Sequence, residues 1–157
     1  MVAWLISICM ASGLCCLPSQ AKQKSKVKVL IVTGQNNHNW KVSHLAIQKI
    51  LDNSGLFVTD VAVSPSKGED MDSFSPDFSS YKLVVLDYNG DSWNGKMQKN
   101  FLDFVQEGGG IVIYHAADNS FPLWRAYNEI CALGGWEGRN EKDGPYAYWK
   151  DGRLVKD

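Results

Sequence analysis

Two histidines of this sequence follow strand-like segments, where α/β proteins place reactive side chains. His115 comes directly after residues 111–114, a β-branched and aromatic run typical of a strand buried on both faces. His38 lies in a polar loop, 34–40, that follows another apolar run. An imidazole at the carboxyl end of a parallel strand can transfer protons, bind a metal ion or orient a substrate. We predict that both histidines act in catalysis; the simpler alternative is that each satisfies a local turn.

Carboxylates and indole rings occur near the same predicted strand ends. Asp118 lies shortly after His115, and we predict that it orients the imidazole. Asp87 lies near the end of a third apolar run, and Trp40 and Trp124 offer flat faces on which a sugar ring can stack. We expect these last three residues to contact substrate. The alternatives are that the carboxylates cap backbone amides and that the indoles belong to the core.

Two imidazoles and a nearby carboxylate also form a ligand set that suits Zn²⁺ or Mn²⁺. Such a site requires that His38 and His115 follow adjacent strands, about 4.8 Å apart, and that Asp118 or Asp87 completes the set. The sequence contains no closely spaced pair such as His-x-x-x-His. We therefore expect that no cofactor is required, and keep a divalent metal as the alternative.

Strand-like and helix-like segments alternate along the chain, which predicts an α/β fold with a doubly wound, mostly parallel sheet. The predicted strands span residues 26–33, 56–63, 82–88 and 111–114. Two amphipathic patterns, 42–51 and 97–105, predict helices, and Pro122 is placed just inside a third. Residues 64–80, rich in Ser, Asp and Pro, are expected to form a surface loop. The segment 146–155 is expected to form a hairpin with a Gly-containing turn.

Several familiar sites and partners are excluded by motif and by charge. The loop after the first predicted strand lacks the Gly-x-Gly-x-x-Gly pattern of dinucleotide sites. No Gly-Lys-Ser/Thr loop, Cys-x-x-Cys, His-Glu-x-x-His or Gly-x-Ser-x-Gly motif occurs. With 16 Lys and Arg against 17 Asp and Glu, the formal net charge is -1, which offers no basic surplus for phosphate groups. Nucleic acid is therefore not an expected partner.

The first 21 residues are predicted to be a signal peptide that is cleaved after Ala21. Its apolar stretch, 2–17, is shorter than the roughly 20 residues that span a bilayer. No Lys or Arg precedes this stretch, so an uncleaved anchor is the alternative. Cleavage would leave Cys131 as the sole cysteine. We expect an exported protein, periplasmic or secreted, that has no membrane segment after cleavage.

Four segments, among them the Gly-Gly-Gly strand that ends in His115, together resemble the trehalose-utilisation (ThuA-like) family. The most specific is the Gly-Gly-Gly strand that ends in His115, followed in order by a Trp-x-x-Tyr and a Gly-Gly-x-x-Gly segment. The segments that carry the resemblance are residues 29–40, 108–118, 124–127 and 134–139. The resemblance runs from Val27 to about Trp149.

This resemblance implies a flavodoxin-like fold of the class I glutamine amidotransferase-like superfamily. His115 then occupies the elbow position where an amidotransferase carries its cysteine nucleophile, so glutaminase chemistry is not implied. Members of the family are linked to the catabolism of trehalose and of keto-sugars, which implies a small-molecule carbohydrate as partner. On the matching segments, Tyr127 and Arg139 join the expected substrate-binding residues.

The resemblance also implies further chain, because family members continue through a His-Pro motif and an acidic Asp-Glu-x-Tyr segment. We therefore expect residues 22–157 to form one ThuA-like α/β domain that is truncated at its C-terminus. The leading hypothesis is an exported protein of trehalose, keto-sugar or glycan catabolism that does acid–base chemistry on a sugar. The alternatives are a non-catalytic sugar-binding module and an inactive fragment of a larger protein. Whether the chain is an enzyme, and whether it forms a homo-oligomer, is left open.

Overall fold

The computed structural model describes residues 25–132, 134, 145 and 147–156. The predicted signal peptide and Arg139 lie outside these residues. Within them, no helix combines the length and the apolar character that crossing a bilayer requires.

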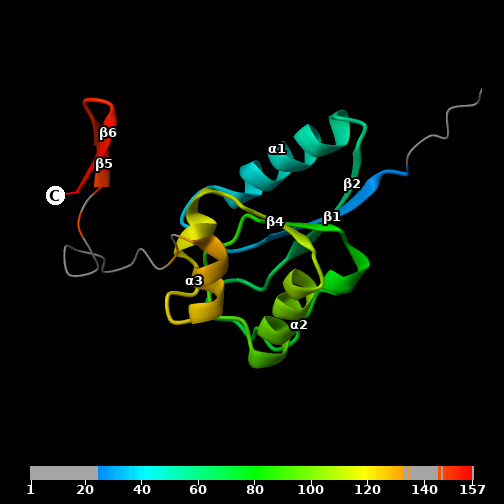
Figure 1. The fold of residues 1–157 in the computed structure, drawn as a ribbon. Helices are drawn as coiled ribbons and strands as arrows, with labels where there is room; N and C mark the ends of the chain where they lie inside the picture. The colour runs from blue at the N-terminus through cyan, green and yellow to red at the C-terminus, as the bar shows by residue number, and fades with distance from the viewer. Residues whose placement is uncertain (1–24, 133, 135–144, 146, 157) are drawn as a thin grey trace, which may run out of the picture.

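Four parallel strands form the central sheet, in the order β2-β1-β3-β4 (Figure 1). β1, Val27–Thr33, pairs with β2, Phe57–Val63, on one side and with β3, Leu83–Leu86, on the other. β4, Gly110–Ile113, pairs with β3 and ends the sheet as described. Because β1 is central, its second half is continuously apolar and buried, as expected for a strand covered on both faces.

Helices cover both faces of this sheet. α1, Trp40–Asn53, connects β1 to β2, and α2, Gly95–Gln106, connects β3 to β4. Successive residues of β1 point to opposite faces: Ile31 packs with Ile47 of α1, whereas Leu30 belongs to a larger cluster that contains Phe101 of α2. The two helices lie on opposite sides of the sheet in Figure 1. The fold is therefore the predicted α/β doubly wound, flavodoxin-like arrangement.

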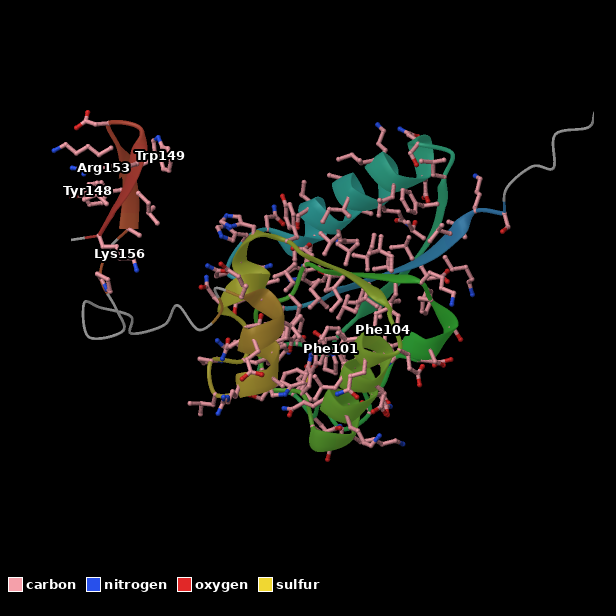
Figure 2. All side chains as sticks on the ribbon, in the orientation of Figure 1. Phe101, Phe104, Tyr148, Trp149, Arg153 and Lys156 are labelled. Carbon is pink, nitrogen blue, oxygen red and sulfur yellow. The ribbon has the colours of Figure 1, made fainter. Side chains whose placement is uncertain are left out.

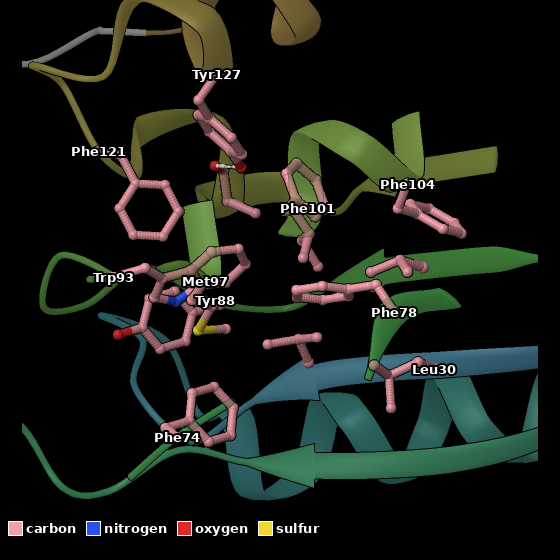
Figure 3. Packing of buried hydrophobic residues seen from close by; sticks show 14 of the residues in the cluster. Leu30, Phe74, Phe78, Tyr88, Trp93, Met97, Phe101, Phe104, Phe121 and Tyr127 are labelled. Carbon is pink, nitrogen blue, oxygen red and sulfur yellow. Dashed lines mark hydrogen bonds between the residues drawn. The ribbon is translucent and has the colours of Figure 1, made fainter. Parts of the chain in front are cut away.

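The larger cluster is an aromatic core that joins α2 to the chain after β4. Tyr88, Trp93, Phe101, Phe121 and Tyr127 all lie in it, each 4% exposed or less (Figure 3). Trp93 meets Phe101 edge to face at 5.6 Å between ring centroids, and Phe121 meets Tyr127 in the same way at 5.0 Å. Aromatic pairs prefer this geometry, and each contributes about 0.5–1.5 kcal/mol beyond burial.

Residues 64–80 form the predicted loop at the surface, but three of their side chains are anchored in the core. Met71, Phe74 and Phe78 are buried in the larger cluster. Phe78 begins a short 3-10 helix, η1, Phe78–Ser80, which precedes β3. The composition of the segment did not predict this attachment, because three apolar side chains suffice to anchor an otherwise polar and exposed loop to the core.

The chain around β4 also differs from expectation. β4 is not buried on both faces, because it lies at the edge of the described sheet and Val112 is 44% exposed. A 3-10 helix, η2, His115–Asn119, follows it, and α3, Arg125–Cys131, begins only after Pro122. Phe121, buried in the core with a φ of 54°, reverses the chain between the two helices. Pro122 therefore lies in this reversal and not in a first helical turn.

The predicted hairpin is confirmed. β5, Ala147–Lys150, pairs antiparallel with β6, Arg153–Lys156. Asp151 and Gly152 connect them with φ values of 50° and 77°, and a positive φ at both central residues is typical of the type I′ turn that Asp-Gly favours. Trp149, labelled in Figure 2, is 72% exposed on this hairpin.

Candidate functional site

An open cleft of about 870 Å³ lies at the carboxyl ends of the four parallel strands. Each strand contributes to its wall through the chain that follows it. The lining residues are Gly34, Gln35, Asn36, Asn37, Trp40 and Lys41 after β1, Ser66 and Lys67 after β2, Asn89 and Gly90 after β3, and Asn119, Phe121 and Pro122 after β4. Open parallel sheets bind ligands at this edge, and ligand sites occupy roughly 300–1,000 Å³. The cleft is therefore the candidate binding site.

Gln35 joins three of the loops around the cleft. Its side chain is 4% exposed; Nε2 donates to the carbonyl oxygen of Pro65 at 2.9 Å, and Oε1 accepts from the backbone nitrogen of Asp91 at 2.7 Å. Its own carbonyl accepts from the backbone nitrogen of Asn89 at 2.9 Å. Gly90 lies so close that a Cβ there would come 2.2 Å from Gln35 Oε1. Gln35 thus holds the loops after β1, β2 and β3 in one arrangement.

Gly34 is required where the chain leaves β1. Its φ is 119°, and a Cβ at this position would lie 2.5 Å from the backbone nitrogen of Ser64. That nitrogen donates to the carbonyl oxygen of Thr33 at 2.8 Å, which keeps the ends of β1 and β2 together. Only glycine combines this backbone conformation with so close an approach.

Asp87 is a buried carboxylate directly after β3, with 1% of its surface exposed. Ser43 Oγ donates to Oδ2 at 2.6 Å, and Thr33 Oγ1 donates to the same oxygen at 3.5 Å. Asn36 Nδ2 donates to Oδ1 at 3.1 Å. Burial raises the pKa of Asp87, while these hydrogen bonds and the charge of His44 act in the opposite direction. Asp87 is not among the lining residues, so it acts on the cleft through Asn36.

Asn36 connects this buried carboxylate to His38. Its Nδ2 donates to Asp87, and its Oδ1 accepts from the backbone nitrogen of His38 at 3.0 Å. The next residue, Asn37, accepts through Oδ1 from Asn89 Nδ2 at 3.3 Å. The loop that carries His38 is therefore attached to β3 and to the loop after it by side-chain hydrogen bonds.

The rings of His38 and His115 stack next to the cleft. Their centroids are 4.4 Å apart with 27° between the ring planes, and both side chains are exposed. The metal hypothesis required that the two histidines follow adjacent strands. They do not, because β3 lies between β1 and β4. The rings nevertheless meet, and the loop that carries His38 is hydrogen-bonded to Asp87 and Asn89, which follow β3. Neither histidine lines the cleft itself, but Asn37 and Trp40, on either side of His38, do.

His115 is presented by a strained turn. Its φ is 49°, in the left-handed region that non-glycine residues seldom adopt. Tyr114 still donates its N–H to the carbonyl oxygen of Leu86 at 3.0 Å, whereas Ala116 and Ala117 are already buried in η2. The chain therefore turns sharply at His115 and leaves its ring exposed. Strain of this kind between a strand and a helix is typical of elbows that present a reactive side chain.

The structure does not bring the other predicted site residues into the cleft. Tyr127 is fully buried, and its hydroxyl donates to the carbonyl oxygen of Ala117 at 2.6 Å. Trp124 stacks on Tyr127 at 5.5 Å between ring centroids. Asp118 is half-buried, and within residues 25–132 no hydrogen bond joins it to either imidazole. Of the residues expected to contact substrate, Trp40 is the one that lines the cleft among those described.

Most of the lining residues were not singled out from the sequence, among them Lys41, Ser66 and Lys67. Lys41 begins the exposed face of α1, and Ser66 and Lys67 belong to the loop after β2. That loop was predicted from its composition to be an ordinary surface loop. The available signal was its position, because every loop that directly follows a parallel strand opens at the ligand-binding edge.

No group of three or more His, Cys, Asp and Glu side chains that could hold a metal ion occurs in the part of the chain that the structure describes. The stacked imidazoles of His38 and His115 offer two nitrogen ligands. Zinc sites take three or four protein ligands. A metal ion bound by this pair would therefore need at least one further protein ligand besides His38 and His115.

A family model and a solved structure match this chain. The family model described as ThuA, trehalose utilisation, matches residues 28–151. A crystal structure of a protein described as thua-like, from Parabacteroides merdae ATCC 43184, is 62% identical with a TM-score of 0.77. The match covers 85% of this chain and 48% of that chain, so this chain spans about half the length of that protein. None of the curated proteins matches the chain.

Proposed function

The chain belongs to the ThuA, trehalose utilisation, family, and from this we propose that it binds a carbohydrate in the cleft and transfers protons on it through His38 and His115. The observation that carries the proposal is the stack of two exposed imidazoles, 4.4 Å apart, next to a cleft lined by amide side chains and an indole. Amides donate and accept hydrogen bonds as sugar hydroxyls do, and an indole face packs on a sugar ring. The site thus offers recognition and proton transfer together.

The two imidazoles can divide the work of general acid–base catalysis. A neutral imidazole accepts a proton from a sugar hydroxyl or from a carbon next to a carbonyl, and the protonated partner donates one to the oxygen that gains electron density. The number of protons on the pair is then unchanged after each turnover. Asp87, through Asn36, holds the backbone of His38 during these steps. The strained backbone of His115 presents the second ring.

Turnover of keto-sugars and disaccharides by the purified chain tests this proposal. His115→Ala and His38→Ala should each lower turnover about 10²- to 10⁴-fold, the usual contribution of a general acid or base. Lys49→Ala is the control, because Lys49 is exposed on α1 and does not line the cleft. Unchanged turnover in His115→Ala would contradict the proposed role.

A second candidate is a sugar-binding module without catalysis. It is favoured by the fact that neither imidazole lines the cleft, while four asparagines and Trp40 do. Titration calorimetry against a panel of glycans, with analysis of the recovered sugar, separates the two candidates. Binding without a new product supports the module, and any product supports proton transfer.

We also propose export, since residues 1–21 have the composition of a signal peptide. The expected mature protein begins at Lys22 in the periplasm or the medium and acts on a carbohydrate there. Expression of the intact sequence, followed by cell fractionation and mass spectrometry of its N-terminus, tests this. A product that retains residues 1–21 in the membrane fraction would support the uncleaved anchor instead.

Proton transfer by the histidine pair requires no cofactor, and a divalent metal at the pair is the alternative mechanism. Elemental analysis of the purified chain at neutral pH distinguishes them. One equivalent of metal that is lost in both His38→Ala and His115→Ala would favour the metal. Substoichiometric metal that neither substitution changes would favour proton transfer alone.

A further inference from the structure

The charge of the cleft wall is entirely positive. Lys41 and Lys67 line it from two segments, one from the start of α1 and one from the loop after β2. No Asp or Glu is among the lining residues of this described cleft. Neither lysine forms an ion pair with any other described residue, since the ion pairs there are Lys99 with Asp103 and Arg125 with Glu129. Two cations therefore line the cleft without an ion-pair partner among the described residues.

The loop that carries Lys67 is held in place by two carboxylates that bind its backbone. Asp91 Oδ2 accepts from the backbone nitrogen of Gly68 at 2.5 Å, and Glu69 Oε2 accepts from that of Ser66 at 2.8 Å. Both carboxylates thus bind backbone nitrogens on either side of Lys67, and neither forms an ion pair with its side chain. The side chain of Lys67 is exposed and stays available to a ligand.

Lys41 is held next to the apolar part of the cleft. Its Nζ lies 5.8 Å from the centroid of the Trp40 ring, within the range of a cation–π contact. A sugar ring that packs on Trp40 would therefore have an ammonium group beside its edge. Lys41 and Trp40 together provide a cation and a stacking face at one end of the cleft.

From these observations we infer that the ligand is a sugar that carries an anionic group, a carboxylate or a phosphate. This inference rests on the proposed carbohydrate-binding function and adds its substrate class. The anionic group is bound by Lys41 and Lys67, and the hydroxyl groups by asparagine side chains such as Asn37 and Asn89. A neutral sugar would leave both cations without a partner in the bound state.

NMR titration of the ¹⁵N-labelled purified chain with glucose, glucuronate and glucose 6-phosphate tests this inference. At low salt, at least one of the two acidic sugars should bind about ten-fold more tightly than glucose, and the preference should weaken in 0.5 M NaCl, because salt screens exposed charges. Tighter binding of glucuronate would identify the anionic group as a carboxylate, and tighter binding of glucose 6-phosphate would identify it as a phosphate. Acetate and inorganic phosphate alone should bind far more weakly than the matching acidic sugar.

Substitutions show whether the lysines cause the preference. Lys41→Gln and Lys67→Gln should each weaken binding of the acidic sugar about five-fold and change glucose binding less than about two-fold, as removal of one partly screened charge requires. Lys49→Gln, on the same helix outside the cleft, is the control.

The outcomes distinguish a failure of this inference from a failure of the proposed carbohydrate-binding function. Equal affinity for glucose and both acidic sugars would overturn the anionic class and leave carbohydrate binding intact. Equal binding of acetate or phosphate and the acidic sugar would also overturn it, as a non-specific anion effect. Binding of none of the three sugars would overturn it together with the proposed carbohydrate function.

Discussion

The imidazole of His38 stacks on the imidazole of His115, although the strands that precede them are separated by β3. Two features make the contact. The loop after β1 is tied to Asp87 and Asn89, which follow β3, and the turn at His115 has a positive φ that directs its ring outward. The pair therefore depends on the whole carboxyl edge of the sheet and not on either loop alone.

This stack predicts an effect of one histidine on the NMR signals of the other. In His38→Ala, the ring protons of His115 should shift, because the ring current of a stacked neighbour is removed. His44→Ala should leave the His115 signals in place, because His44 lies on α1 and its ring contacts Trp40. Two-dimensional spectra of the imidazole region check this. Identical His115 signals in wild type and His38→Ala would show that the rings do not stack in solution.

Asp87→Asn should destabilise the fold by about 1–3 kcal/mol, because the new amide group faces donors that the carboxylate had satisfied. The donors are Ser43, Thr33 and Asn36. Chemical denaturation measures the change. The control is Asp103→Asn, which removes an exposed ion pair with Lys99 and should change stability by less than about 1 kcal/mol. Equal effects of the two substitutions would contradict a structural role for Asp87.

The same carboxyl group predicts a pH dependence of stability. Burial raises the pKa of Asp87 above the ordinary value of 3.8, so the folded chain holds this proton more tightly than the unfolded chain. Its contribution to stability is complete below 3.8 and is lost as the pH rises through the raised pKa of the folded state. Asp87→Asn is uncharged throughout, so the stability advantage of wild type over this variant should shrink as the pH rises from about 4 toward neutrality. Denaturation curves over that range check the sign, and an advantage that grows with pH would contradict it.

Glycine substitutions should separate positions that need glycine from one that does not. Gly34→Ala and Gly90→Ala should each cost about 1–3 kcal/mol or more, because a Cβ would overlap Ser64 or Gln35. Gly95→Ala, at the first position of α2, meets no atom within 4 Å and should be neutral or slightly stabilising. Thermal unfolding of the three variants measures the differences. A neutral Gly90→Ala would mean that Gln35 does not hold the loops as described.

Trp40 is predicted to supply the stacking face of the cleft. Trp40→Ala should weaken sugar binding about ten-fold, the loss of about 1.4 kcal/mol, whereas Trp40→Phe should retain most of the affinity because it keeps an aromatic face. Val42→Ala, on the same helix and 60% exposed, is the control. Calorimetric titration with the sugar that binds best measures all three. Equal affinity in Trp40→Ala and wild type would place the sugar elsewhere.

Much of the fold could be predicted because its signals are local. β1 and β2 are apolar runs of nearly the predicted extent, and the Asp-Gly turn of the hairpin follows from the conformational preferences of two adjacent residues. β3 was predicted too long, since Asp87 and Tyr88 are as buried as a strand residue but lie past its end. Burial alone therefore does not mark where a strand stops.

The candidate site was only partly predictable, because it depends on contacts between residues far apart in the chain. Trp124 and Tyr127 have residue types suited to binding sugars, yet they pack in the aromatic core. Whether an aromatic side chain faces a ligand or a core depends on which elements surround it. Lys67 lines the cleft because of how the loop after β2 is held, in part by the hydrogen bond from Gln35 to Pro65, and no local pattern of residues predicts that contact.

The sequence by itself determined the alternation of strands and helices, the hairpin and the family resemblance, because propensities, periodicity and motifs are carried by residues close together in the chain. Tertiary structure alone decided that β3 separates β1 from β4, that His38 nevertheless stacks on His115, and that Asp87 is buried behind Asn36. These contacts join residues far apart in the chain. They depend on strand order and loop conformation, which no local pattern of side chains predicts.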